Sequence, residues 1–158
     1  MRILIVYDSR TGNTKKEALE IAKGVREIEH VEYIIKSAQE ATMEDLRKSH
    51  GLVIGCPTYY GSMSGSLKTF FDKTNSIHGK LEGKVGAAFT SSDSTATGAE
   101  TTILSILEAM LVHGMIIQGD PNDKHYGMAV VKALNKREAL LCRRFGHRVA
   151  ELTKRLAK

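Results

Sequence analysis

A run of small polar residues near the start of the chain has the composition of an anion-binding site. It lies between an apolar segment, residues 2–7, and a helical pattern, and it consists of Ser9, Arg10, Thr11, Gly12, Asn13 and Thr14. Serine and threonine hydroxyls donate hydrogen bonds, glycine lets a backbone approach a ligand closely, and a helix N-terminus presents free N–H groups. Capping of the helix by Thr11 or Asn13 is the simpler alternative. Capping accounts for one of these residues but not for six in a row, so the run predicts a phosphate site.

Two motifs that the sequence lacks narrow the kind of phosphate. The dinucleotide motif G-x-G-x-x-G is absent from this turn, and the triphosphate motif G-x-x-x-x-G-K-[ST] occurs nowhere in the chain. A mononucleotide phosphate is the candidate that remains.

A second polar segment follows the third apolar run and contains two adjacent tyrosines. From Cys56 to Thr74 it reads C-P-T-Y-Y-G-S-M-S-G-S-L-K-T-F-F-D-K-T. Together with the first segment it resembles the flavodoxin-like superfamily, and most closely the tryptophan-repressor-binding-protein type of NAD(P)H:quinone oxidoreductase. Those proteins carry P-T-R-x-G-x-M-x-G followed by a helix with L-K-x-F-x-D. Tyr59 stands where they usually have arginine, and this chain is shorter than they are.

The resemblance implies FMN as the cofactor and NAD(P)H as the electron donor. The isoalloxazine ring of FMN needs a flat apolar or aromatic wall and backbone N–H donors. By resemblance, the residues that wrap this ring are expected to be Pro57, Thr58, Tyr59, Tyr60, Gly61, Ser62 and Met63. The alternative is that the two tyrosines are partly buried surface aromatics.

A third polar segment follows the fourth apolar run and is expected to line the pyrimidine edge and ribityl chain of the flavin. Its predicted contacts are Thr90, Ser91, Ser92 and Asp93. Because Ser, Thr and Gly are also common in connections, a plain flexible loop is the alternative.

His113 is the remaining candidate catalytic residue. In the resembling oxidoreductases the matching histidine lies near the flavin, so His113 is expected to hydrogen-bond the substrate oxygen, with Tyr59 and Tyr60 shaping the acceptor pocket. Gly114 follows it, so a purely structural role at the end of a helix is the alternative.

The apolar pattern predicts a scaffold that brings these segments together. Five strand-like runs, at residues 2–7, 31–36, 51–56, 84–90 and 115–118, alternate with helical periodicity. This alternation predicts an α/β fold with a parallel sheet and helices on both faces. The flavodoxin-like resemblance implies a doubly wound sheet in the order 2-1-3-4-5. Ligands of such sheets bind at the carboxyl ends of the strands, where the polar segments begin.

Length and composition indicate a single domain over residues 1–158. No apolar run reaches the length of a membrane span and no signal peptide is recognisable, so a cytoplasmic protein without a membrane partner is expected. The two cysteines, Cys56 and Cys142, fit a reducing compartment. A net charge of +5 raises the question of nucleic-acid binding. The C-terminal cations share a helix with an apolar stripe, however, which favours a solvated helix face and no nucleic-acid partner.

The sequence lacks the residues that several other kinds of chemistry require. The six histidines form no H-x-x-x-H or H-E-x-x-H pattern, so no metal site is expected. Cys56 lacks the arginine that a phosphatase-type cysteine loop needs, because Ser62 stands at that position. A response regulator would need an aspartate at the end of the third strand, where Cys56 and Pro57 lie.

The leading hypothesis is an FMN-dependent oxidoreductase that passes electrons from NAD(P)H to a quinone or a similar small-molecule acceptor. A flavodoxin-type electron carrier is the main alternative, and a binding module that has lost FMN is another. Carriers of that family are typically acidic around the flavin, so the positive net charge favours the oxidoreductase. The resembling enzymes are dimers or tetramers, and a homo-oligomer is therefore expected.

Overall fold

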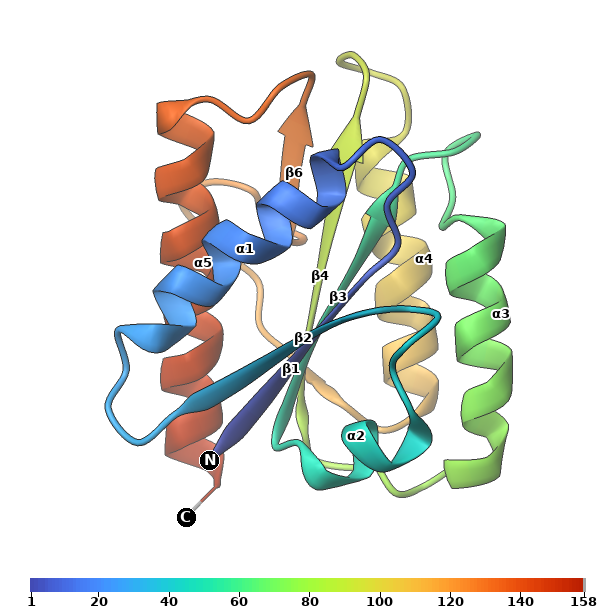
Figure 1. The fold of residues 1–158 in the computed structure, drawn as a ribbon, viewed down its shortest axis with the longest axis vertical. Coiled ribbons are helices and arrows are strands. Elements are labelled where there is room, and N and C mark those ends of the chain that lie inside the picture. The colour runs from blue at the N-terminus through green and yellow to red at the C-terminus, as the bar shows by residue number, and fades with distance from the viewer. Residues whose placement is uncertain (158) are drawn as a thin grey trace.

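The computed structural model describes residues 1–157 and has three layers, with a sheet between two layers of helices (Figure 1). The strands are β1 (Arg2–Tyr7), β2 (Glu32–Ser37), β3 (Gly51–Pro57), β4 (Val85–Ser92), β5 (Ile116–Ile117) and β6 (Met128–Val131). The helices are α1 (Asn13–Arg26), α2 (Met43–Lys48), α3 (Gly65–Lys73), α4 (Ala99–Val112) and α5 (Lys136–Leu156), with a 3-10 turn, η1, at Thr74–Ile77. In residues 1–157 no helix is long and apolar enough to cross a membrane.

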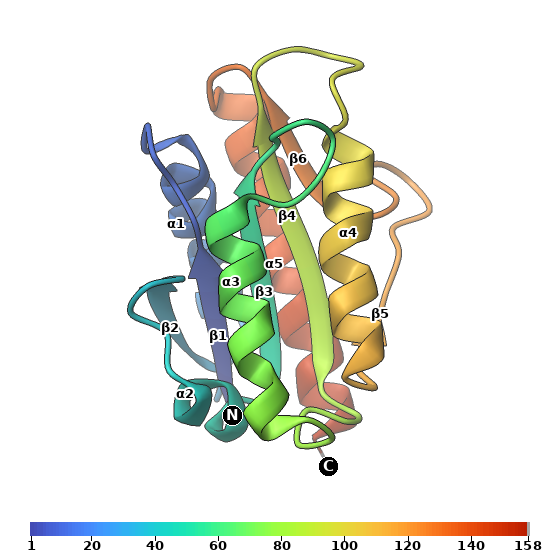
Figure 2. The ribbon, with the colours of Figure 1, turned by 90° about the vertical axis from the view of Figure 1, so that its right-hand side faces the viewer.

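The sheet is parallel and its order is β2-β1-β3-β4-β5, which confirms the predicted topology. The prediction of one fifth strand at residues 115–118 was incomplete. Beside β4, β5 pairs with Val85 and Gly86, and β6 pairs with the stretch from Phe89 to Ser92. The fifth strand position of the sheet, beside β4, is thus occupied by two short strands. They are joined by residues 118–127, which run outside the sheet (Figure 2).

Two strands are longer than their sequences suggest. We expected β3 to end at residue 56 and β4 at residue 90, but Pro57 pairs with Ser91 and β4 continues to Ser92. Polar side chains at the end of a buried strand are stable when their hydroxyls are hydrogen-bonded, and those of Thr90, Ser91 and Ser92 all are.

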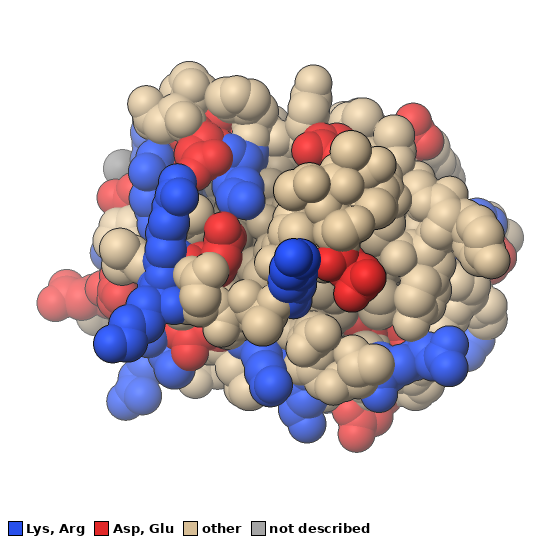
Figure 3. All heavy atoms as spheres, turned by 90° about the horizontal axis from the view of Figure 1, so that it is seen from above, with Lys and Arg blue, Asp and Glu red and all other residues tan. Residues whose placement is uncertain are grey.

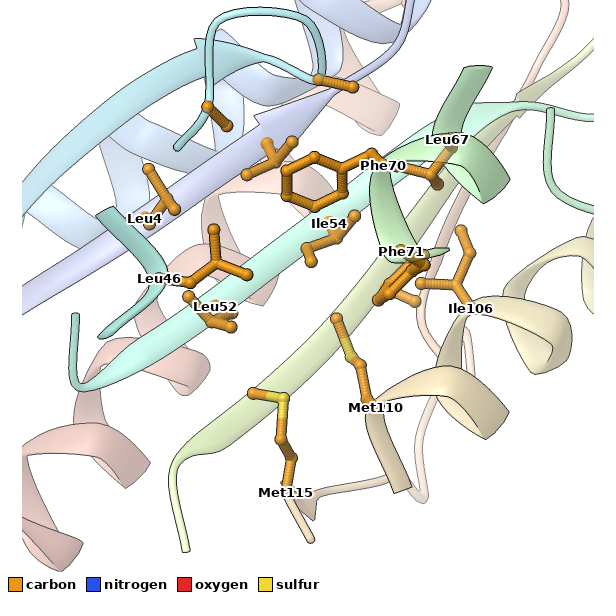
Figure 4. Packing of buried hydrophobic residues seen from close by; sticks show 14 of the residues in the cluster. Leu4, Leu46, Leu52, Ile54, Leu67, Phe70, Phe71, Ile106, Met110 and Met115 are labelled. Atoms are coloured by element: carbon orange, nitrogen blue, oxygen red, sulfur yellow. The ribbon is translucent and has the colours of Figure 1, made fainter. Parts of the chain in front are cut away.

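Alternating residues of the strands bury their side chains in two separate apolar layers. In β1, Leu4 and Val6 face the layer under α3 and α4, whereas Ile3 and Ile5 face the layer under α1 and α5. Figure 4 shows the first of these layers, in which strand, α3 and α4 side chains interdigitate, among them Leu4, Leu52, Ile54, Phe70, Phe71, Ile106 and Met110. Burial of this apolar surface is the main stabilising contribution to the fold.

The helices α1 and α5 cross with their backbones in contact. A Cβ added to Gly24 would overlap the carbonyl of Arg143, and one added to Gly146 would overlap that of Ile21. Glycine is therefore required at both positions. The crossing places the second half of α1, at Ile21 and Gly24, against Arg143 and Gly146 near the middle of α5.

Candidate functional site

The three polar segments meet at the carboxyl edge of the sheet. The Oγ1 of Thr14 in α1 and the Oγ of Ser91 in β4 are 2.7 Å apart and buried. The backbone N–H of Thr58 donates to the carbonyl of Ser91 over 2.8 Å, and its hydroxyl lies 3.0 Å from that of Thr90. Direct hydrogen bonds therefore join segments that are far apart in the sequence.

The first segment leaves donors free at the start of α1. Gly12 is the N-cap with a left-handed φ of 90°, and the first-turn N–H of Lys15 is accepted by the Oγ of Ser9 at 3.4 Å, so the capping alternative for Thr11 and Asn13 is wrong. The Oγ of Ser9 accepts the N–H of Gly12 at 3.1 Å, while the N–H groups of Asn13 and Thr14 have no acceptor within residues 1–157. A Cβ at Gly12 would meet no atom within 4 Å. Free N–H groups at an open helix N-terminus fit a phosphate group.

Asp8 is a site residue that sequence reasoning missed. It follows β1 directly, is buried, and accepts a hydrogen bond of 2.6 Å from the Oγ of Ser64. Ser64 also caps α3 by accepting the N–H of Leu67. The pair thus ties the first segment to the second, and an acidic residue directly after an apolar strand was the signal that could have revealed it.

The second segment forms a tight turn that projects a tyrosine. Tyr59 and Ser62 exchange backbone hydrogen bonds of 3.3 and 3.1 Å, and between them Tyr60 and Gly61 have φ values of 51° and 71°. The side chain of Tyr60 is fully exposed and that of Tyr59 partly exposed. A tyrosine in the left-handed region is strained, and such strain concentrates at functional sites. The projecting ring fits an aromatic wall for a flat ligand.

The helix α4 holds this turn in place through residues that sequence reasoning also missed. The N–H of Met63 donates to the Oγ of Ser105 over 3.0 Å, and the Oγ1 of Thr102 donates to the carbonyl of Ser62 over 3.3 Å. Gly98 lies so close to the turn that a Cβ there would be 2.5 Å from the Cα of Gly61.

Three of the four predicted contact residues of the third segment lie in β4, and an irregular connection begins only after Ser92. Thr90, Ser91 and Ser92 are buried in β4, and only Asp93 is exposed. Thr90 donates from Oγ1 to the carbonyl of Cys56 over 2.7 Å and has no exposed surface. The structure therefore gives Thr90 a supporting position under the second segment in place of the predicted ligand contact.

The structure contradicts the predicted position of His113. This residue ends α4 at the amino edge of the sheet, opposite the three polar segments, because the N–H of Gly83, just before β4, donates to the carbonyl of the next residue, Gly114, over 3.0 Å. Its Nε2 is 2.7 Å from the Oγ1 of Thr74, whose proton is donated to the carbonyl of Phe71. Nε2 must therefore carry the ring proton. Burial, followed by the neighbouring His78, lowers the pKa of His113, so the ring is neutral and structural.

The charges at the carboxyl edge are mixed. Figure 3 looks onto this edge and shows Lys and Arg side chains gathered mainly on the side of α1 and α5, with Asp and Glu side chains among them.

Cys56 lies beneath the turn, and burial raises the pKa of its thiol to about 11, which opposes nucleophilic chemistry. No cluster of three or more His, Cys, Asp and Glu side chains within the described residues is arranged to hold a metal ion.

Comparisons with known proteins agree with this geometry. The profile of the family described as NADPH-dependent FMN reductase matches residues 1–122. A flavodoxin from Aquifex aeolicus is 37% identical over 158 residues, which span 95% of this chain and 85% of that protein. An NAD(P)H dehydrogenase (quinone) from Archaeoglobus fulgidus is 34% identical, and the match covers 98% of both chains.

A solved structure shows the same fold. The flavodoxin described as WrbA-like from Agrobacterium tumefaciens superposes with a TM-score of 0.83 at 21% identity, covering 98% of both chains.

Proposed function

Because the chain belongs to the NADPH-dependent FMN reductase family, we propose that it is an FMN-dependent oxidoreductase that passes electrons from NAD(P)H to a quinone or a similar small-molecule acceptor. One observation carries the proposal: the open N-terminus of α1 and the strained Tyr60 turn lie at one edge and are bonded to the same strand, β4, through Ser91 and Thr90.

The residues present fit FMN, and each has a definable task. The N–H groups of Asn13 and Thr14, together with the left-handed backbone at Gly12, suit the phosphate. The Tyr59 and Tyr60 rings suit the isoalloxazine, and the N–H groups of Tyr60 and Gly61 have no acceptor in residues 1–157 and can face its polar edge. When bound, FMN supplies a ring that accepts hydride from a nicotinamide and releases electrons to an acceptor.

The chain's own contribution is orientation. Asp8, Thr58, Thr90 and Ser105 hold the two ligand-facing segments through hydrogen bonds of 2.6 to 3.0 Å. Because these segments are held before the ligand binds, the site loses little conformational entropy of its own on binding.

A second candidate is an electron carrier, which the flavodoxin relatives favour. Besides the Aquifex protein, a flavodoxin from Clostridium saccharobutylicum is 32% identical over 99% of both chains. The positive net charge of +5 and the exposed cations beside the site, such as Arg10 and Lys15, favour the nicotinamide-dependent enzyme, because a positive field attracts an anionic dinucleotide.

An anaerobic visible spectrum distinguishes the oxidoreductase from the electron carrier. It is recorded on the protein with stoichiometric FMN, before and after addition of NADPH or NADH. We expect a perturbed flavin band that the nicotinamide bleaches rapidly. A perturbed band that nicotinamide does not bleach supports the carrier, and an unperturbed band argues against FMN altogether.

We also propose that the chain forms a homo-oligomer. Leu111, Val112 and Ile116 are exposed on α4 and β5 at the amino edge, where three large apolar side chains in contact with water mark a candidate interface. Light scattering of the wild type and of the Val112→Lys variant tests this: the wild type should be larger than one chain and the variant smaller than the wild type.

A further inference from the structure

The helix α1 buries a carboxylate one turn beyond the phosphate segment. Glu17 has no exposed surface, and neither of its carboxylate oxygens has a hydrogen-bond partner within residues 1–157. Its neighbours along the same helix, Ala18 and Ile21, belong to the apolar layer under α1 and α5. A buried carboxylate without partners is strongly disfavoured in its charged form and takes up a proton instead.

The groups around Glu17 come from three elements, and most are acidic. On α5, Glu138 and Cys142 face it, and Glu20 lies on α1 itself, paired with Lys23 and Arg143. The connection between β5 and β6 contributes one cation, Lys124. Its Nζ is 3.7 Å from Glu138 and donates to the carbonyl of Ala129 over 2.8 Å.

One cation therefore lies near two carboxyl groups, the buried Glu17 and the half-buried Glu138. Burial, followed by the charge of Glu138, raises the pKa of Glu17 well above its ordinary value, and Lys124 opposes this only in part. The Oε2 of Glu138 is likewise buried without a hydrogen-bond partner among the described residues. The arrangement holds one proton on Glu17 at neutral pH.

The phosphate segment is close enough to sense that proton. Glu17 follows Thr14 by three residues, or about 4.5 Å along a helix axis. Thr14 is itself anchored to Ser91 in the buried interior. A phosphate at the N-terminus of α1 and an ionised Glu17 would be like charges close together in a medium that screens them poorly, and each disfavours the other.

We propose that Glu17 is a proton-linked determinant of FMN affinity: the chain binds the FMN phosphate when Glu17 is protonated, and ionisation of Glu17 weakens binding. The proposal rests on the assignment of residues 9–14 to the phosphate. By linkage, phosphate binding in turn favours the protonated carboxyl, so FMN binding takes up a proton at alkaline pH.

The test is the dissociation constant of FMN between about pH 7 and pH 9.5, where the phosphate, whose second pKa is about 6, stays doubly charged. We expect the wild type to lose about tenfold in affinity across this range. Glu17→Gln, which is neutral at every pH, should keep the neutral-pH affinity throughout. Glu29→Gln, which removes an exposed carboxylate beyond the far end of α1, is the matched control and should behave as the wild type does.

Two further variants distinguish electrostatic coupling from a structural effect. Glu138→Gln removes a negative charge that disfavours ionised Glu17, so Glu17 should ionise more easily and the loss of FMN affinity should begin at lower pH than in the wild type. Lys124→Gln should shift the loss to higher pH. Riboflavin, which lacks the phosphate, should show no such pH dependence in any variant.

The outcomes are distinguishable. Identical pH profiles for the wild type and Glu17→Gln overturn the proposal, whereas failure of both to bind FMN at any pH overturns the phosphate assignment. If Glu17→Gln does not fold, calorimetry of the wild type at about pH 9 in buffers of different ionisation enthalpy decides. Proton uptake with FMN but not with riboflavin supports the proposal, and no uptake with FMN contradicts it.

Discussion

The two edges of the sheet both carry polar side chains, but they use them differently. At the amino edge the polar groups bond one another: Lys84 donates to the carbonyls of Leu46, Arg47 and Ser49 at 3.1, 2.5 and 2.6 Å, and His113 donates to Thr74. At the carboxyl edge, N–H groups at the start of α1 and in the Tyr60 turn lack protein acceptors within residues 1–157. Free donors on a rigid frame mark a ligand site, whereas paired ones mark a structural joint.

The largest effect expected from this comparison follows from a negative charge at Gly12. Gly12→Asp places a carboxylate at the proposed phosphate position and should lower FMN affinity by at least about a hundredfold, because like charges in contact cost several kcal/mol. Gly79→Asp is the matched control, since Gly79 also has a left-handed φ and open space but lies in a loop after η1. Fluorescence titration measures both. Stoichiometric FMN on Gly12→Asp would remove the phosphate assignment.

A smaller effect, on stability alone, is expected at the amino edge. Lys84→Met leaves the carbonyls at the end of α2 without their donor and should lower the free energy of unfolding by about 1 to 2 kcal/mol. FMN affinity should not change. Lys80→Met, at an exposed lysine of the same region, is the control for loss of charge. Urea unfolding and FMN titration give the two readouts, and weakened FMN binding by Lys84→Met would contradict the separation of the edges.

The next effect depends on pH. The pKa of His113 is lowered in the folded protein, so as the pH falls below about 6.5 the unfolded chain takes up this proton first and stability declines. His113→Gln should cost about 1 kcal/mol near pH 7.5 through the lost hydrogen bond to Thr74. The difference in the free energy of unfolding between the wild type and His113→Gln, measured by urea unfolding, should become smaller toward pH 5.5. A fall in NAD(P)H-dependent turnover with unchanged stability would restore His113 to the active site.

The smallest effect is expected at Tyr60, where binding and stability should change in opposite directions. Tyr60→Asn relieves the left-handed strain, because asparagine tolerates this region, and should raise the free energy of unfolding by about 0.5 kcal/mol. Loss of the ring should weaken FMN binding a few-fold. Tyr126→Asn removes another exposed tyrosine and should leave FMN binding unchanged. Equal FMN affinities for Tyr60→Asn and the wild type would exclude the ring as part of the flavin wall.

Much of this fold could be predicted because its signals are local. The Val- and Ile-rich run at residues 2–7 became β1 without a change of bounds, and the predicted apolar face of α1, with Ala18, Ile21 and Val25, is buried. The strand β6 was missed because four residues are too few to show a clear strand pattern, and because the edge strand beside β4 is split into β5 and β6. The position of His113 was predictable in principle: a helix that follows β4 returns to the amino edge, so the residue before β5 must lie there.

The sequence by itself determined the strand and helix alternation, the polar segments that follow the strands and the presence of a glycine at the start of α1, since each depends on neighbouring residues. Only the tertiary structure decided which hydroxyls and N–H groups remain free, because their acceptors, such as Ser105 for Met63, come from distant elements. It also decided that Glu17 is buried. From the sequence, Glu17 is one polar residue of an amphipathic helix. It is buried because α5 packs closely against α1, with Gly24 and Gly146 at the crossing.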